Sequence, residues 1–307
     1  MPDQLKQLRI VDPVLTNLAR GYHNAQFVAE ALFPTVLVDK EGVIVPLFGK
    51  EAFRLWDTER AIRAASNVMT PDGIDTLDVV LREHDLAYPV DYRESAESRF
   101  DIEARAAIRV KDAIDLKREY STAQLAQAPA SYPSGSKVAL SGASQWSNNG
   151  GDPVQTVEDG KEVVRGKIGV RPNTMIMGAA AYATLKFHEK LQEALGANER
   201  KLITVEHLKA LFGMPHIAVG EALAGDDGVS DIWGDNVILA YVPAARAGSE
   251  RNYDEPSFGY TLRRRGMPET DRYDADGGKV RYVRHTDIYK SVIVGADAGY
   301  LISDVAA

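Results

Sequence analysis

The chain contains no cysteine in its 307 residues, which excludes disulfides, thiolate metal sites and cysteine nucleophiles together. It also has no apolar run approaching the roughly 20 residues that a membrane-spanning helix needs. The N-terminal stretch lacks the positive patch followed by an apolar run that marks a secretory signal. We therefore expect a protein that makes no membrane contact and is assembled in the cytoplasm.

Motifs of catalysis are absent as well. The chain has no G-x-S-x-G, no G-x-x-x-x-G-K-[ST], no H-E-x-x-H and no G-x-G-x-x-G. His188-Glu189 begins a zinc-protease motif without its second histidine, and His188 falls on the apolar stripe of a predicted helix, which favours a core or interface histidine. His84-Asp85 stands without any serine marked as activated. We expect no catalytic, cofactor-binding or metal-binding residues, and thus no enzyme.

A basic surface for nucleic acid is also missing, since the net charge is −8 and the isoelectric point is about 5.4. The one short basic run is Arg263, Arg264 and Arg265, in a stretch that reads as a strand. Side chains alternate along a strand, so this run is divided between two faces. Ion pairs between subunits or solvated charge are the expected roles, in preference to phosphate contacts.

The chain does contain one long charged helix, predicted over residues 98–128, where Gly and Pro are absent and good helix formers abound. Ser98 or Asp101 can cap its start, and Pro129 marks its end. About 30 residues at a rise of ~1.5 Å give a rod of roughly 45 Å. Apolar residues at spacings of three and four predict one packing stripe, formed by Ala106, Val110, Ala113, Leu116, Tyr120 and Ala123.

Before this helix, residues 36–90 read as a two-stranded ribbon with a charged tip. Such a ribbon is barely stable alone in water and needs a partner surface. Its charges, together with the arginine run and a tryptophan that is either an anchor or a local core plug, are the candidates for contacts between subunits. These candidates are Lys50, Glu51, Arg54, Trp56, Asp57, Glu59, Arg60, Arg63, Arg263, Arg264 and Arg265.

After the helix, alternating helix and strand patterns from about 150 to 243 predict a compact α/β unit. Asp152 and Pro153 favour a helix start, and Gly196 favours the end of a helix over 179–195. Further strands are predicted near 257–264, 279–285, 287–294 and 299–304, with a turn at 274–278. The fold class expected is α+β.

These parts, in this order, resemble the major capsid proteins of tailed bacteriophages, whose fold is shared with encapsulin shells. The likeness is strongest in SQWSNNGGDPVQTVEDGKEVV, in RPNTMIMGAAAYATLKFHEKLQEAL and in ITVEHLKALFGMPHIAVGEA. The resemblance implies five parts: an N-terminal arm (1–35), an extension loop (36–90), a peripheral domain (91–144) containing a spine helix at 98–128, an axial domain (145–262) and strands returning to the peripheral domain (263–307).

The resemblance also implies a structural function: self-assembly into hexamers and pentamers of an icosahedral or prolate head shell around double-stranded DNA, without sequence-specific contact. It implies a place in the virion, with a portal, a possible decoration protein, and a scaffold that is either separate or a precursor region absent from this sequence. Two alternatives remain: an encapsulin-like compartment and a cytoplasmic α/β enzyme whose dispersed polar residues form an unrecognised site.

Overall fold

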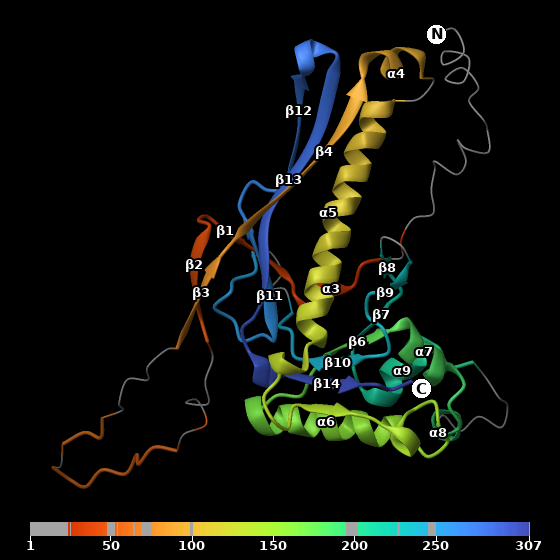
Figure 1. The fold of residues 1–307 in the computed structure, drawn as a ribbon. Helices are drawn as coiled ribbons and strands as arrows, with labels where there is room; N and C mark the ends of the chain where they lie inside the picture. The colour runs from red at the N-terminus through yellow and green to blue at the C-terminus, as the bar shows by residue number, and fades with distance from the viewer. Residues whose placement is uncertain are drawn as a thin grey trace.

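The computed structural model describes residues 24, 26–47, 53, 55–63, 65–68, 75–98, 101–194, 202–225, 228–244 and 250–306. Most of the expected arm lies outside this set, as do Lys50, Glu51 and Arg54. The described chain forms an upper sheet with a long helix beside it, a lower sheet with shorter helices, and a loop that projects from the side of the molecule (Figure 1). The predicted α+β class is confirmed.

Five strands form the upper sheet: β1 (Thr35–Val38), β4 (Arg82–Asp91), β11 (Gly259–Arg264), β12 (Glu269–Ala275) and β13 (Val280–Ile293). The long strand β13 is central, antiparallel to β12 and β4 over its first part and to β11 near its end. β1 pairs with β11 in parallel. The sequence predicted two strands in place of β13. The predicted break does not occur because Thr286 and Asp287 stay paired with β4.

The long helix, α5 (Ile102–Gln127), runs along β4 and β13 (Figure 1). Asp101 caps it, with its carboxylate accepting a hydrogen bond from the backbone N–H of Ala104 at 2.9 Å. The alternative cap, Ser98, instead ends the short helix α4 (Tyr92–Glu97) by donating its N–H to the carbonyl of Glu94. The C-terminal end before Pro129 agrees with the prediction.

The buried face of α5 differs from the predicted stripe. Ala106, Val110 and Ala123 are buried and Leu116 is half-buried, but Ala113 and Tyr120 are exposed, so the prediction was wrong for these two. The buried face follows steps of four, from Ala106 through Val110 to Ile114. A row at i, i+4 is inclined to the helix axis, and an inclined row can follow the twist of the sheet beneath it.

Five strands form the lower sheet: β5 (Lys137–Ala139), β6 (Thr174–Gly178), β7 (His216–Gly220), β10 (Val237–Ala240) and β14 (Gly299–Ser303). Their order is β5-β14-β10-β6-β7. Four helices accompany this sheet: α6 (Pro153–Ile168), α7 (Ala179–Lys186), α8 (Glu189–Ala194) and α9 (Val205–Phe212).

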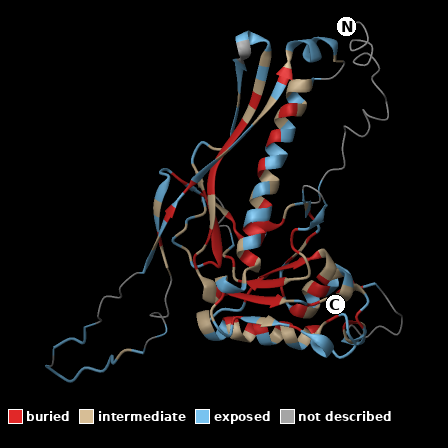
Figure 2. Cartoon of the chain, in the orientation of Figure 1, coloured by how far each residue is buried: buried red, intermediate tan, exposed pale blue. Residues whose placement is uncertain are grey.

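The lower sheet separates two cores. Met175, Leu239 and Ile302 point to the face covered by α6 and α9, whereas Ile176 and Leu301 point to the face reached by the end of α5. Side chains of a strand alternate in this way, so one short apolar strand contributes to both cores. Figure 2 shows the buried residues concentrated here and along one side of α5.

Gly160 allows α6 to lie directly on the lower sheet. A Cβ at this position would come within 2.8 Å of Tyr300 Cδ1 and 2.9 Å of Leu239 Cδ1. Tyr300 and Leu239 belong to the core under α6. A larger residue at position 160 would therefore force the helix away from the sheet.

Three predictions for the two sheets and their helices were wrong. The helix predicted over 179–195 is broken between α7 and α8, because the backbone N–H of Ile203 donates to the carbonyl of Lys186 and ends α7 there. The last strand, β14, lies in the lower sheet, although residues 263–307 were expected to return to the upper one. Conversely, β11 belongs to the upper sheet, although its residues were assigned to the axial part.

A hairpin covers the face of the upper sheet opposite α5. Its strands are β2 (Gly42–Pro46) and β3 (Thr76–Val80). Val45 and Val79 pack there against Leu262 and Ile288 of the upper sheet.

The remaining short elements are α3 (Ala29–Leu32), β8 (Leu223–Ala224), β9 (Ser230–Asp231), η2 (Pro129–Ser131), η3 (Gly142–Ser144), η4 (Asp276–Gly278) and η5 (Ala296–Ala298). No helix among the described residues is long and apolar enough to cross a membrane.

Candidate assembly surfaces

No chemical centre emerges from the described residues. They contain no cluster of three or more histidine or acidic side chains that could hold a metal ion. The pair His84-Asp85 does not form a relay, because His84 stacks on Tyr289 with ring centroids 4.2 Å apart while Asp85 accepts a hydrogen bond from Thr286 at 3.2 Å. The sites that remain to be explained are therefore surfaces and buried polar junctions.

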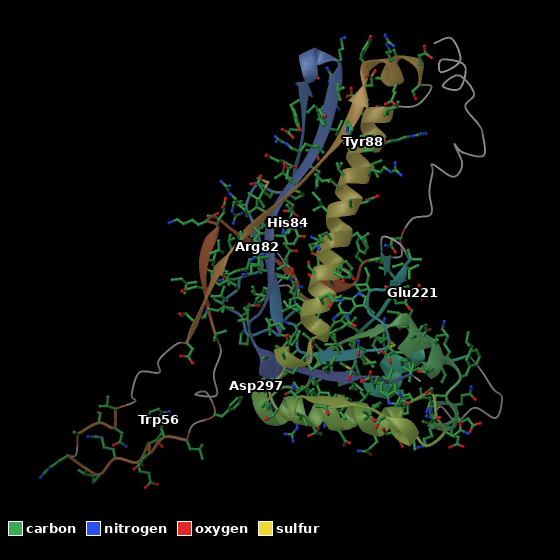
Figure 3. The ribbon with its side chains drawn as sticks, in the orientation of Figure 1. Trp56, Arg82, His84, Tyr88, Glu221 and Asp297 are labelled. Atoms are coloured by element: carbon green, nitrogen blue, oxygen red, sulfur yellow. The ribbon has the colours of Figure 1, made fainter. Side chains whose placement is uncertain are left out.

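One partly buried polar junction lies on the α5 face of the upper sheet, where the exposed Arg82 and the half-buried His84 and Tyr88 follow one another along β4 (Figure 3). Burial lowers the pKa of the His84 imidazole, against the opposing effect of Asp287. Burial also raises the pKa of the Tyr289 hydroxyl to about 12. Both groups are therefore uncharged at neutral pH. The histidine acts here as an aromatic packing residue.

The arginine run pairs within the chain. Arg263 contacts the buried carboxylate of Asp287 at 2.9 Å, Arg264 contacts Glu41 at 2.9 Å, and Arg265 contacts both Asp39 and Glu250 at 2.9 Å. We expected ion pairs between subunits or solvated charge. The structure shows acidic partners on neighbouring segments of the same chain, and contacts of these arginines with another subunit stay a prediction. The side chains do alternate along the strand as expected: Arg263 pairs with the buried Asp287 of β13, and Arg264 pairs with Glu41 beside β2.

A second junction, which sequence analysis missed, is centred on Glu119 of α5. Its buried carboxylate accepts hydrogen bonds from the backbone N–H groups of Val28 (3.0 Å) and Ala29 (3.0 and 3.2 Å), and from Trp233 Nε1 at 2.7 Å. Three segments far apart in sequence meet on one side chain. The sequence held one signal for this junction: Glu119 lies three residues after Leu116 and four before Ala123, and so falls on the same side of the helix as these apolar residues. A glutamate on a buried helix face is rarely left unpaired.

The projecting part of the extension loop, unlike the Glu119 junction, leaves most of its described side chains exposed. Asn67 holds it closed by donating hydrogen bonds to the carbonyls of Asp57 (2.8 Å) and Glu59 (2.9 Å). Yet the side chains of Leu55, Ile62 and Val68 are 97%, 93% and 84% exposed. Sequence analysis missed these three apolar residues, because charged residues dominate the pattern around them.

Five of the predicted contact residues in this loop, Trp56, Asp57, Glu59, Arg60 and Arg63, lie among the described residues. Trp56 is half-buried and lies on the projecting loop (Figure 3). The side chains of Asp57, Glu59, Arg60 and Arg63 are exposed. Nearer its base, the Phe53 ring of the loop lies so close to Gly169 of the body that a Cβ at Gly169 would come within 2.7 Å of it.

A hollow of about 520 Å³ lies at the break between α7 and α8, lined among others by Trp146, Phe187 and His188. A second hollow, of about 630 Å³, lies between the end of α6 and the segment around Asp297, which forms an ion pair with Lys167 at 3.0 Å (Figure 3). Neither hollow contains a cluster of catalytic groups.

Comparison with known proteins gives these surfaces their context. The family model described as phage major capsid protein E matches residues 26–276. The major capsid protein of Burkholderia phage BcepMu is 52% identical over 304 residues, covering 98% of this chain and 99% of that protein. That likeness spans the extension loop, α5 and both sheets.

Solved structures agree. A phage-related protein from Bordetella bronchiseptica RB50 matches with a TM-score of 0.74 at 32% identity, covering 97% of this chain and 98% of that one. The capsid of Cyanophage P-SCSP1u matches in fold, with a TM-score of 0.60 at 12% identity and coverage of 92% and 89%. The chain therefore belongs to the phage major capsid protein E family and is a structural protein of a phage head shell.

Proposed function

We propose that copies of this chain close into a shell of hexamers and pentamers around double-stranded DNA, and that they assemble in the host cytoplasm. The observation that carries the proposal is the near-complete exposure of Leu55, Ile62 and Val68 on a loop that projects from the body. Exposed apolar groups gathered on one projecting segment mark an interaction site. Covering such groups with a neighbouring copy removes apolar surface from water.

The one-sided position of the loop favours rings. A loop that reaches from one side of a subunit must be received by a different surface of its neighbour, which makes the contact heterologous. Heterologous contacts produce closed rings when the rotation between copies closes. The charged neighbours of the apolar residues, Asp57, Glu59 and Arg60 among them, can set the register between copies.

We also propose that the subunit makes only weak contact with the enclosed DNA. The net charge of −8 repels phosphate, and Arg263, Arg264 and Arg265 are already paired with carboxylates of their own chain. We expect the isolated subunit to bind double-stranded DNA without sequence preference, and this binding to vanish between low and physiological salt. A scaffold, a portal and a decoration protein would be separate partners of the same shell.

Electron microscopy of the purified chain, followed by measurement of the DNA content of the particles from infected cells, tests the proposal. We expect closed particles with rings of six and five, containing DNA. Particles enclosing protein cargo without DNA would instead indicate an encapsulin-like compartment. A monodisperse monomer or dimer under all conditions, including with the other head proteins present, would contradict the proposal.

A further inference from the structure

The hollow at the α7–α8 break contains unused hydrogen-bonding groups. Trp146 and His188 are only 1% and 7% exposed. Within the described part of the chain, neither Trp146 Nε1 nor either ring nitrogen of His188 has a hydrogen-bond partner. Leaving such buried groups unpaired costs free energy. Both side chains line the hollow, so these groups, which are closed to solvent in the free subunit, lie beside any partner that fills it.

The chemistry of the hollow defines that partner. Burial lowers the pKa of His188, and Lys190 lowers it further, so the imidazole is neutral at neutral pH and carries one donor and one acceptor. The indole of Trp146 adds a second donor. Lys190 is already engaged with Asp152 and with the carbonyl of Gly150. The hollow thus presents two neutral N–H donors and one acceptor.

The surroundings favour a peptide group over a free anion. Glu189 and Glu193 line the hollow and are exposed, so their carboxylates repel a small anionic ligand. A backbone carbonyl has an oxygen acceptor without net charge. The exposed Phe187 ring at the same hollow provides apolar surface for the chain that carries this carbonyl.

The position of the hollow fits a contact between copies. Helix α8 and the projecting loop lie at opposite sides of the molecule (Figure 1). A ring of identical subunits needs contact surfaces on two sides of each subunit. The hollow therefore lies on the side of the subunit that faces the neighbour whose loop reaches towards it.

We propose that this hollow is a socket in which Trp146 and His188 bind a backbone carbonyl of a neighbouring copy of the chain in the shell. The inference rests on the proposed assembly function and adds a second contact to it. Before assembly the socket adds nothing to the stability of the subunit. After assembly it joins adjacent copies at the side away from the extension loop.

Paired tryptophan variants test the socket. Trp146 and Trp233 are both fully buried, but the indole N–H of Trp233 is bonded to Glu119 inside the subunit. We expect Trp146→Phe to raise the subunit concentration needed for half-assembly by about twofold to tenfold, the range of one lost hydrogen bond. Trp233→Phe should lower subunit stability more than Trp146→Phe does, yet assemble at the wild-type concentration wherever it is folded.

Two variants of His188 test whether assembly depends on the hydrogen-bonding groups of its side chain. His188→Gln retains one donor and one acceptor and should assemble like the wild type, whereas His188→Leu retains neither and should weaken assembly by about twofold to tenfold. The melting temperature of the His188→Leu subunit should stay at the wild-type value or rise, because an unpaired buried polar group is removed. Normal assembly of both Trp146→Phe and His188→Leu overturns the proposal.

Hydrogen–deuterium exchange of the Trp146 indole N–H, followed by ultraviolet resonance Raman spectroscopy and assigned with the Trp146→Phe variant, reads the contact directly. We expect exchange to be at least tenfold slower in shells than in free subunits. An equal rate in wild-type shells would overturn the socket and leave the shell function standing. Failure of the wild type to form shells would overturn both.

Discussion

The extension loop and the lower layer treat their apolar groups in opposite ways. In the lower layer, alternate residues of the strands β6, β10 and β14 are buried on opposite sides of the sheet, in two cores made by this chain. In the loop, Leu55, Ile62 and Val68 are left in water, although Asn67 fixes the backbone around them. The two cores of the lower layer are closed within one chain, whereas we propose that a neighbouring copy covers the apolar groups of the loop.

This difference separates stability from assembly. Changes in the two cores of the lower layer, other than at the socket residues Trp146 and His188, or in the junctions on α5 should lower the free energy of unfolding of the subunit. Changes in the projecting loop should leave that free energy alone and act only on shells.

The largest effect is expected from removing the loop. The backbone N–H of Leu47 donates to the carbonyl of Asp75 at 2.8 Å, so a short turn can replace residues 48–74 and close the hairpin of β2 and β3. Shells should be lost completely while the subunit stays soluble and unfolds cooperatively, as measured by electron microscopy and thermal denaturation. An unfolded subunit would show that the loop belongs to the core.

A triple substitution, Leu55→Ser with Ile62→Ser and Val68→Ser, is the matched control for that deletion. It keeps the length and charge of the loop and removes only its exposed apolar groups. We expect the same loss of shells at unchanged melting temperature. Normal shells would show that the charged residues carry the contact alone.

The next largest effect concerns the buried face of α5. Val110→Asp places an unpaired charge against the sheet and should cost about 4 kcal/mol or more, leaving the subunit insoluble or poorly folded. Ile108→Asp, on the exposed face of the same helix, should change the free energy of unfolding by less than about 0.5 kcal/mol. Urea denaturation compares the two variants. Equal effects would mean that the buried face is wrongly assigned.

Glu119→Ala should cost about 3 kcal/mol, because it leaves three N–H donors without an acceptor where the arm, α5 and the Trp233 segment meet. Glu119→Gln keeps one oxygen but turns an amide donor towards these groups, and should recover only part of the loss. Thermal denaturation of the free subunit gives the ranking. A fully stable Glu119→Ala subunit would contradict the junction.

The smallest effects separate two arginines of one strand. Arg263→Ala leaves the buried carboxylate of Asp287 without its cation and should cost about 3 kcal/mol. Arg265→Ala removes exposed pairs with Asp39 and Glu250 and should cost less than about 1 kcal/mol, diminishing further in salt. Denaturation at two salt concentrations measures both, and a salt-sensitive loss at Arg263 would be inconsistent with its buried pair.

Local rules predicted the elements with strong local signals. The α5 helix was predicted from its composition and from Pro129, and the α6 start from Asp152, whose carboxylate accepts from the N–H of Gln155 at 3.0 Å. The break after α7 could not be predicted, since the group that ends the helix is the N–H of Ile203, far along the chain. The placement of β14 likewise depends on pairing with β10 and β5.

The candidate contact residues show the same limit. Charge identified Asp57, Glu59, Arg60 and Arg63 as surface residues, and the structure leaves them exposed. Charge alone could not show that Arg263 has a partner within the chain, because Asp287 comes alongside it only through the pairing of β11 with β13. Nor could it show that Leu55 and Ile62 stay in water, because exposure depends on where the loop leaves the body.

The central claim is that a neighbouring copy covers the extension loop. Hydrogen–deuterium exchange with mass spectrometry, comparing peptides over residues 55–68 in free subunits and in purified shells, tests it most directly. We expect exchange in this segment to slow at least tenfold on assembly, while peptides from β6 and β10 stay equally protected in both states. Equal, fast exchange of residues 55–68 in subunits and shells would contradict it.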